Sequence, residues 1–264
     1  MSSKISKIEA ERIDGLVAYY RDNLEQFKRF MGSVQSLFNN VEALTPYIHS
    51  TKWRIKDPAH LKDKLKRQVI QCKKDNERFE ITKENLFEKM TDLVGYRILH
   101  LHTTQIDKIN KVILDLLKKD DYVLIEGPIA RTWDSESEAY FKSIDIETRD
   151  TGRMYTSVHY LFKANKRALP TCELQVRTLA EEVWGEVDHM INYPHPSHIT
   201  TCREQIKVLA RVTSSCSRLV DSIFQSYNEN CTQSTLQKKR RHASPGKSSK
   251  ANQTVKRSGA KRKN

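Results

Sequence analysis

A chain of 264 residues with 38% hydrophobic residues is long enough to bury a substantial core, in one large domain or two small ones. Its formal charge of +13 is uneven, because residues 238–264 hold eleven Lys or Arg and no acid, which is all but two of the net positive charges. We therefore expect a nearly neutral folded body and a disordered basic tail over residues 231–264. Such a tail binds polyanions loosely; a specific contact with RNA or tRNA is the alternative.

The cysteines, at positions 72, 172, 202, 216 and 231, are not spaced in pairs. This usage predicts reduced thiols in a cytoplasmic protein, with neither a disulfide framework nor a zinc site. The polar, charged N-terminus has no signal-peptide pattern, and no apolar run approaches the length that crosses a membrane. The sequence therefore predicts a soluble protein without a membrane partner.

Helices are predicted at the beginning of the chain, in a segment that we assign to residues 1–50. Apolar residues recur at helical spacing between residues 5 and 31, and again between Val34 and Leu44. Asp57-Pro58 predicts the start of a further helix that ends near Cys72, because aspartate caps a helix and proline suits its first turn.

Strands and helices alternate in the predicted core, residues 51–195. Composition and periodicity predict strands at 92–101, 122–125, 157–162 and 171–177, and helices at 106–117 and 178–193. Residues 127–150 give no clear pattern. After a break at Pro194–Pro196, a long helix is expected over about 201–227, within a C-terminal segment of residues 196–230. This order predicts an α/β (α+β) domain, a mixed β-sheet flanked by helices with further helices at both ends.

Polar residues gather in four short stretches of this core. They are Arg54–Asp57 with His60 and Lys64, Asp92–Arg97, Tyr155–His159, and Glu173–Arg177. Alternation along the last strand puts Glu173, Gln175 and Arg177 on one face. On the helix that follows, helical spacing aligns Glu182, Glu186, His189 and Tyr193.

Cations placed ahead of two carboxylate-bearing strands are typical of polyphosphate chemistry. Lysine and arginine neutralise phosphate oxygens, carboxylates hold Mg²⁺, and an aromatic ring offers a stacking surface to a base. Each stretch alone is more typical of an ordinary surface or core, so the hypothesis depends on their combination. Asp188-His189 predicts no metal site, because adjacent residues on a helix point in different directions.

In this order the four stretches resemble the synthetase domain of the RelA/SpoT family of alarmone synthetases, over roughly residues 50–195. The most specific part is the block Glu-x-Gln-x-Arg-Thr…Trp…Glu…His…Tyr, which begins at Glu173. The resemblance implies a nucleotidyltransferase-like fold. It also implies an enzyme that transfers the β,γ-diphosphate of ATP to the 3′-hydroxyl of GDP or GTP, giving ppGpp or pppGpp. We expect a small, synthetase-only member, whose terminal helices serve in homo-oligomer assembly as in some relatives.

The resemblance assigns two acids to catalysis and to Mg²⁺. Asp92 resembles the family's metal ligand at the start of a core strand. Glu173 resembles the second acid, which activates the attacking hydroxyl and also reaches the metal.

The resemblance assigns the remaining site residues to the two nucleotides. Arg54, Lys56 and Lys64 resemble the cations on the ATP side, and His60 stands where the family often has serine. Tyr155 matches the tyrosine that stacks on the acceptor guanine, with His159 beside the acceptor phosphates. The residues expected to support phosphates or the two carboxylates are Arg97, Gln175 and Arg177.

The segment before Tyr155 departs from the family pattern. Many members have Asn-Gly-Tyr, whereas this chain has Thr151-Gly-Arg-Met-Tyr155. The acceptor therefore stays open. GDP or GTP is the first hypothesis, and the second transfers the same group to the 3′ end of tRNA or to adenine nucleotides, as some toxic relatives do. A non-catalytic nucleotide- or RNA-binding module is the third, against which the presence of both Asp92 and Glu173 argues.

Overall fold

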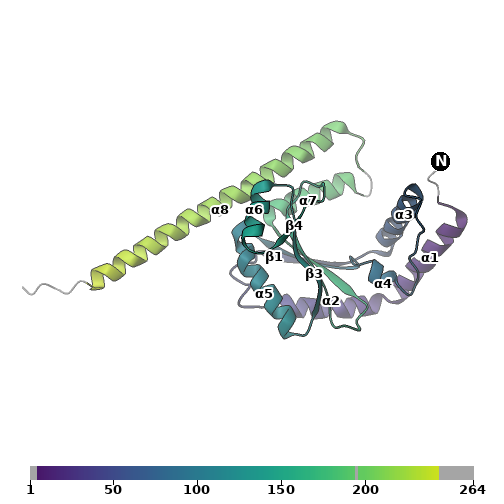
Figure 1. Ribbon diagram of the computed structural model, residues 1–264, viewed down its shortest axis with the longest axis horizontal. Helices are drawn as coiled ribbons and strands as arrows, with labels where there is room; N and C mark the ends of the chain where they lie inside the picture. Colours follow the sequence, from purple (N-terminus) through teal and green to yellow (C-terminus); the bar gives the residue numbers. More distant parts are fainter. Residues whose placement is uncertain (1–4, 194–195, 244–264) are drawn as a thin grey trace, which may run out of the picture. The chain divides into compact units, whose positions relative to one another are not determined.

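The computed structural model describes residues 5–193 and 196–243, and the chain divides into two compact units, residues 1–222 and 223–264. The first unit contains a six-stranded mixed sheet with helices on both faces (Figure 1). The described part of the second unit is the C-terminal portion of one helix. The mixed sheet with flanking helices confirms the predicted fold class.

The elements follow in a single order along the chain. The helices are α1 (Lys7–Asp22), α2 (Leu24–Phe38), α3 (Pro58–Lys74), α4 (Leu86–Lys89), α5 (Ile106–Lys119), α6 (Ser135–Ser143), α7 (Leu179–Asn192) and α8 (Thr200–Ala243). The strands are β1 (Ser50–Ile55), β2 (Val94–His100), β3 (Val123–Arg131), β4 (Glu147–Arg149), β5 (Ser157–Lys163) and β6 (Thr171–Thr178).

The strands lie in the order β1-β2-β6-β5-β3-β4, and their register gathers polar residues on one face. β2 runs parallel to β6, so that Gly95 lies opposite Glu173 and Arg97 opposite Gln175. On the outer sides of this pair, β1 places Arg54 opposite Gly95, and β5 places His159 opposite Gln175. Because side chains alternate along a strand, the residues between these positions form the opposite face.

That opposite face is apolar and lies in the hydrophobic core. Tyr96, Tyr160 and Leu174 are almost completely buried there. Helices α2 and α5 cover this face, and α7 lies on the polar face (Figure 1). The Phe38 ring lies 5.3 Å from the Tyr96 ring, and the Tyr160 hydroxyl donates to Asn110 Oδ1 on α5 (2.8 Å). The core runs without interruption across the predicted boundary at residue 50.

The N-terminal helix α1 also fixes the position of Lys56, one of the cations predicted for the site. The buried hydroxyl of Tyr20 on α1 donates a hydrogen bond to the carbonyl oxygen of Lys56 (2.7 Å). One residue later, Asp57 caps α3 by accepting the N–H of Ala59 (2.7 Å), as the Asp-Pro signal predicts. Lys56 is therefore held between the end of β1 and the start of α3.

Several elements before α8 differ from the predicted ones. The helical stripe over residues 5–31 is interrupted at Asn23, whose side chain donates to the carbonyl oxygen of Tyr19 (2.8 Å) between α1 and α2. β1 has no counterpart among the predicted strands. The unclear segment 127–150 contains the second half of β3, then α6 and β4.

The C-terminal helix is longer than predicted. α8 continues to Ala243, so residues 231–243 are helical, where the sequence predicted the beginning of a disordered tail. This stretch contains Leu, Gln, Lys and Arg, which favour a helix even without an apolar face. The rest of the predicted tail, residues 244–264, lies outside the described residues. In the described part of the chain, no helix has the length and apolar character needed to cross a bilayer.

Candidate active site

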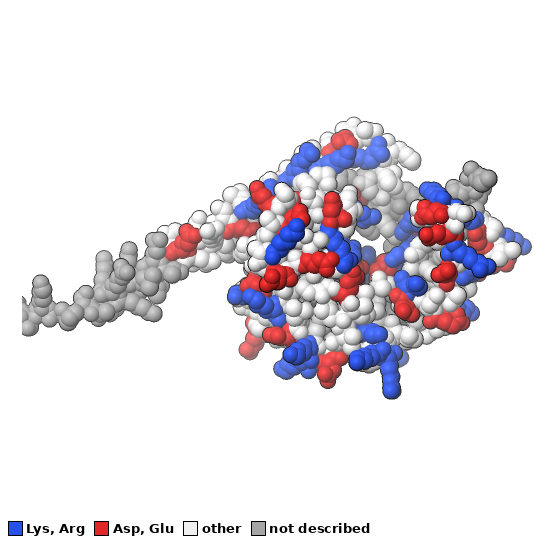
Figure 2. Space-filling view, viewed as in Figure 1, with Lys and Arg blue, Asp and Glu red and all other residues white. Residues whose placement is uncertain are grey.

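The polar face of the sheet forms the floor of a cleft between α3 and α7. Two adjoining cavities, of about 920 and 740 Å³, make up this cleft. The hollow between the two helices is visible in Figure 2, with Lys and Arg side chains around it. The residues that line both cavities are Arg54, Arg67, Asp92, Arg153, His189 and Tyr193.

Asp92 lies two residues before β2, at the junction of the two cavities. Its Oδ2 accepts a hydrogen bond from Lys56 Nζ (2.7 Å), and its Oδ1 forms an ion pair with Lys64 Nζ (2.9 Å). Burial raises the pKa of Asp92, but the charges of Lys56 and Lys64 outweigh it and hold the pKa below its usual value. The carboxylate is therefore ionised and surrounded by cations.

Glu173 on β6 is the second carboxylate of the cleft. Its Oε1 accepts hydrogen bonds from His159 Nδ1 (3.0 Å) and Gln175 Nε2 (3.2 Å). Burial raises the pKa of Glu173, but the hydrogen bond and charge of His159 outweigh it and lower the pKa to about 2. Burial in turn lowers the pKa of His159, whose Nε2 is buried without a hydrogen-bond partner among the described residues.

Gly95 of β2, which follows Asp92 along the chain and lies opposite Glu173, leaves the floor of the cleft without a side chain at this position. Gly95 lies beside both Arg54 and Glu173, and a Cβ added to it would be 3.5 Å from Arg54 Cγ. The Arg54 side chain therefore lies across the bare backbone of β2. Asp92, Gly95 and Glu173 all line the 920 Å³ cavity.

The two carboxylates fit what Mg²⁺ needs from a protein when it binds with a nucleotide. This ion commonly takes one or two carboxylates and completes its shell with waters and substrate phosphates. Among the described residues, no group of three or more acidic, histidine or cysteine side chains could hold a metal by itself. Asp92 and Glu173 are the residues that could hold Mg²⁺ here, together with the phosphates of a nucleotide.

A third acid, Glu182 on α7, organises the cations at the other side of the cleft. Its carboxylate accepts hydrogen bonds from Lys52 Nζ (2.8 Å), Arg97 Nη1 (2.8 and 2.9 Å) and Arg177 Nε (2.7 Å). Burial raises the pKa of Glu182, but the Lys52 hydrogen bond and the two guanidinium charges lower it to about 2. The sequence indicated that Glu182 and Glu186 share one face of a helix. It did not indicate the contact with Lys52, because Lys52 lies on β1, which was not predicted.

Arg177 needs a glycine on the facing helix. A Cβ added to Gly185 of α7 would be 2.6 Å from Arg177 Nη1. The buried guanidinium group therefore packs directly against the helix backbone while it binds Glu182.

Tyr155 stands on an aromatic support. Its ring stacks on Trp184 of α7, with ring centroids 5.9 Å apart and planes 11° apart. Trp184 is fixed in turn, because its Nε1 donates to the carbonyl oxygen of Ile206 on α8 (3.0 Å). One face of the Tyr155 ring is thereby occupied and the residue lines the cleft.

Sequence reasoning did not select Arg67 on α3. Its guanidinium group lies 5.2 Å from the centre of the Tyr193 ring, and its Nη1 is buried without a hydrogen-bond partner in the described part of the chain. The Tyr193 ring stacks on His189 at 4.5 Å. The signal was present, because His60, Lys64 and Arg67 share one helical face.

All predicted site residues except His159 line the two cavities of this cleft. Those that line the larger cavity are Arg54, Asp92, Arg97, Tyr155, Glu173, Gln175 and Arg177. Lys56 and Lys64 line the adjoining cavity. His159 lines neither cavity and contacts the site through its hydrogen bond to Glu173.

A mixed sheet with carboxylates and cations facing one cleft is typical of proteins that bind polyphosphates. Residues 53–198 match the family model described as the region found in RelA/SpoT proteins. The chain belongs to the RelA/SpoT family, as its motifs predicted.

Individual relatives are distant in sequence. The GTP pyrophosphokinase YjbM of Bacillus subtilis (strain 168) is 22% identical over 214 residues, which cover 78% of this chain and 84% of that protein. A GTP pyrophosphokinase family protein from Streptococcus pneumoniae has a similar structure, with a TM-score of 0.57, 18% identity and coverage of 80% and 95% of the two chains. The small alarmone synthetase 1 from Bacillus subtilis bound to its product pppGpp gives a TM-score of 0.46 at 20% identity, over 82% of this chain and 96% of that one. The likeness to the Streptococcus pneumoniae protein supports the assigned fold.

Proposed function

We propose that this protein is a nucleotide pyrophosphokinase that transfers the β,γ-diphosphate of ATP to the 3′-hydroxyl of GDP or GTP. The observation that carries the proposal is that Asp92 and Glu173 line one cavity together with cations from β1, β2 and β6. Membership of the RelA/SpoT family and the pyrophosphokinase name of the Bacillus subtilis relative support it.

The proposed reaction is a displacement at the β-phosphorus of ATP. The ionised Glu173 carboxylate accepts the proton of the acceptor 3′-hydroxyl while the oxygen of that hydroxyl bonds to the β-phosphorus. The bond from the β-phosphorus to the oxygen that bridges it to the α-phosphorus breaks, and AMP leaves. Arg54, Lys56 and Lys64 hold the polyphosphate in line and neutralise its charge. Mg²⁺ held by Asp92 and Glu173 would supply further neutralisation of the transferred and leaving phosphates.

The acceptor is the part of the proposal that most needs an experiment. The protein is incubated with γ-labelled ATP and Mg²⁺ and, in separate reactions, GDP, GTP, no added acceptor or deacylated tRNA. We expect label on GDP and GTP. If only tRNA or only adenine nucleotides become labelled, the acceptor is that molecule and not GDP or GTP. If no molecule becomes labelled, the assignment as a pyrophosphokinase is overturned.

Tyr155→Ala should raise the KM for the guanine nucleotide about 10-fold or more and leave the KM for ATP nearly unchanged. The reason is that stacking of a base on an aromatic side chain contributes roughly 1–3 kcal/mol. Steady-state kinetics with each nucleotide varied in turn measures both constants. Tyr227→Ala, which removes an exposed tyrosine of α8, is the matched control. Equal changes in the two KM values would contradict the placement of the acceptor base at Tyr155.

Location and assembly are further parts of this proposal. A cytoplasmic location is consistent with the free thiols of Cys72, Cys172, Cys202 and Cys216. We also propose that the basic tail, residues 231–264, contacts RNA and that the chain assembles into homo-oligomers. Binding of labelled tRNA to the full chain and to a chain that lacks residues 232–264 tests the first, and light scattering of the purified protein tests the second.

A further inference from the structure

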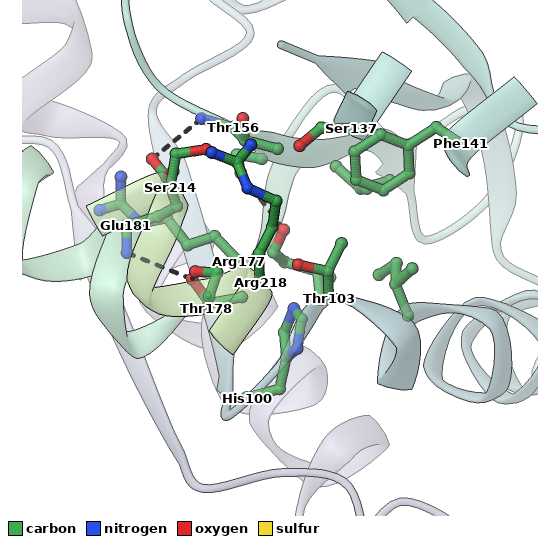
Figure 3. Close-up of a pocket in the computed structure, with 15 residues that line it drawn as sticks. His100, Thr103, Ser137, Phe141, Thr156, Arg177, Thr178, Glu181, Ser214 and Arg218 are labelled. Atoms are coloured by element: carbon green, nitrogen blue, oxygen red, sulfur yellow. Dashed lines mark hydrogen bonds between the residues drawn. The ribbon is translucent and has the colours of Figure 1, made fainter. Parts of the chain in front are cut away.

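A third cavity, of about 20 Å³, lies at the C-terminal ends of β2 and β6, and neither Asp92 nor Glu173 lines it. The first residues of β5, the start of α7, and parts of α6 and α8 surround it. Figure 3 shows Glu181, Thr156 and Ser214 close together, with Phe141 at the opposite side of the view. Glu181 is 3% exposed, so its carboxyl group is enclosed within the protein.

Glu181 contacts the backbone next to the ring proposed to bind the acceptor. The N–H of Thr156 donates to Glu181 Oε2 (3.0 Å), and the hydroxyl groups of Thr156 and Thr132 lie 2.9 Å apart. Three residues further along α7, Trp184 supports the Tyr155 ring. Helix α7 therefore contacts the Tyr155–Thr156 segment at two points. Glu181 binds the backbone of Thr156, and Trp184 packs against the ring of Tyr155.

Charged groups from several elements face the Glu181 carboxyl group. Arg177 approaches from β6, and Asp134, which precedes α6, is paired with Arg218 of α8 at 2.6 Å. His100 of β2 lines the cavity, but burial lowers its pKa to about 4, so it is neutral at physiological pH. Burial raises the pKa of Glu181 to about 7, and this effect outweighs the Thr156 hydrogen bond and the charge of Arg177.

We propose that Glu181 is a positioning residue for the acceptor-binding ring: its ionised carboxylate holds the Tyr155–Thr156 segment against α7, and protonation of that carboxylate weakens the hold. This role rests on the proposed function at one point only, namely that Tyr155 binds the acceptor. The physical basis is that a hydrogen bond from an N–H to a carboxylate is about twice as strong as one to a neutral acceptor. Acceptor affinity should therefore fall as the pH decreases through 7.

The first measurement needs no nucleotide. Amide hydrogen exchange at Thr156, corrected for the intrinsic dependence of exchange on pH, is recorded by NMR between pH 6 and pH 8. In the wild-type protein, protection at pH 8 should exceed protection at pH 6 by about 5-fold, the equivalent of one charge-assisted hydrogen bond over a neutral one. In Glu181→Gln, which keeps an oxygen acceptor but has no charge to lose, protection should not change with pH. Glu88→Gln, at an exposed site on α4, should behave as the wild type.

The second measurement is the KM for GDP over the same pH range. Because nucleotide phosphates also titrate near pH 6, the informative quantity is the difference between the variant and the wild type. We expect the wild-type KM to rise about 5-fold more than that of Glu181→Gln between pH 8 and pH 6. If Glu181 has only a structural role, Glu181→Gln should instead have a higher Tm than the wild type at pH 8, because the substitution removes a buried charge. The pH dependence of Thr156 exchange and of the KM would then be the same in the two proteins.

The outcomes separate the two proposals. A pH-dependent Thr156 exchange that Glu181→Gln abolishes, in a protein that labels no acceptor, would support the positioning role and overturn the proposed function. Exchange and KM profiles that are the same in the wild type and Glu181→Gln, in a protein that labels GDP, would overturn the positioning role and leave the proposed function intact.

Discussion

Replacing Asp92 with asparagine, or Glu173 with glutamine, should lower the kcat of diphosphate transfer by about 10³-fold or more. For Glu173 the loss is that of the group that accepts the hydroxyl proton, which contributes roughly 10²–10⁴-fold in comparable sites. For Asp92 the change removes a carboxylate proposed to hold Mg²⁺ and leaves two lysines facing a neutral amide. Both replacements preserve side-chain shape, so the fold should persist.

Single-turnover transfer of label from ATP, with circular dichroism on the same samples, measures the effect apart from folding. Asp63→Asn is the matched control, because Asp63 lies on α3 and its side chain is 46% exposed in an ion pair with Lys66. It should retain wild-type activity. A folded Asp92→Asn or Glu173→Gln protein whose kcat is within tenfold of the wild type would remove the chemical basis of the proposed mechanism.

The elements that the sequence predicted correctly are those with a buried, periodic face. β5, β6, α5 and α7 lie within a few residues of their expected bounds. β1 was missed because it is an edge strand that is mostly exposed, and its residues therefore show no apolar alternation. The second half of β3 was hidden by Gly127-Pro128, next to which the pairing with β5 shifts register.

The sequence predicted which side chains of one strand share a face, but not which residues of neighbouring strands lie side by side. Alternation placed Glu173, Gln175 and Arg177 on one face, and all three line the cleft. No local pattern indicates that Gly95 lies beside Glu173, because pairing register is a property of the whole sheet. Glu181 and Glu182 show the same limit, since two adjacent glutamates on one helix have opposite pKa shifts in different surroundings.

The second large effect concerns stability. Glu182→Gln should lower the free energy of unfolding by about 3 kcal/mol at pH 7, as expected when one partner of a buried ion pair is removed. Arg177 is the reason, because its guanidinium group is buried, packs against Gly185 and would retain no carboxylate partner as close as Glu182. Urea unfolding followed by tryptophan fluorescence gives the difference directly.

Glu186→Gln is the matched control for this prediction. Glu186 contacts the same cations, Arg97 at 3.2 Å and Lys52 at 3.4 Å, but its side chain is 50% exposed. Its loss should therefore cost less than about 1 kcal/mol. Equal losses in the two variants would mean that burial is not what makes the Glu182 contact strong.

The pH dependence of stability gives an independent check on the same carboxylate. The pKa of Glu182 is lower in the folded protein than in the unfolded chain, so the unfolded chain binds the proton more tightly. The stabilisation is therefore fully present above the ordinary glutamate pKa and is lost as the pH falls toward 2. Glu182→Gln has no such proton to gain, and its difference from the wild type should shrink over this acidic range. If the difference in free energy of unfolding between the wild type and Glu182→Gln stays constant from pH 7 to pH 2, the destabilisation comes from packing. Only an interaction of the ionised carboxylate is lost when Glu182 is protonated.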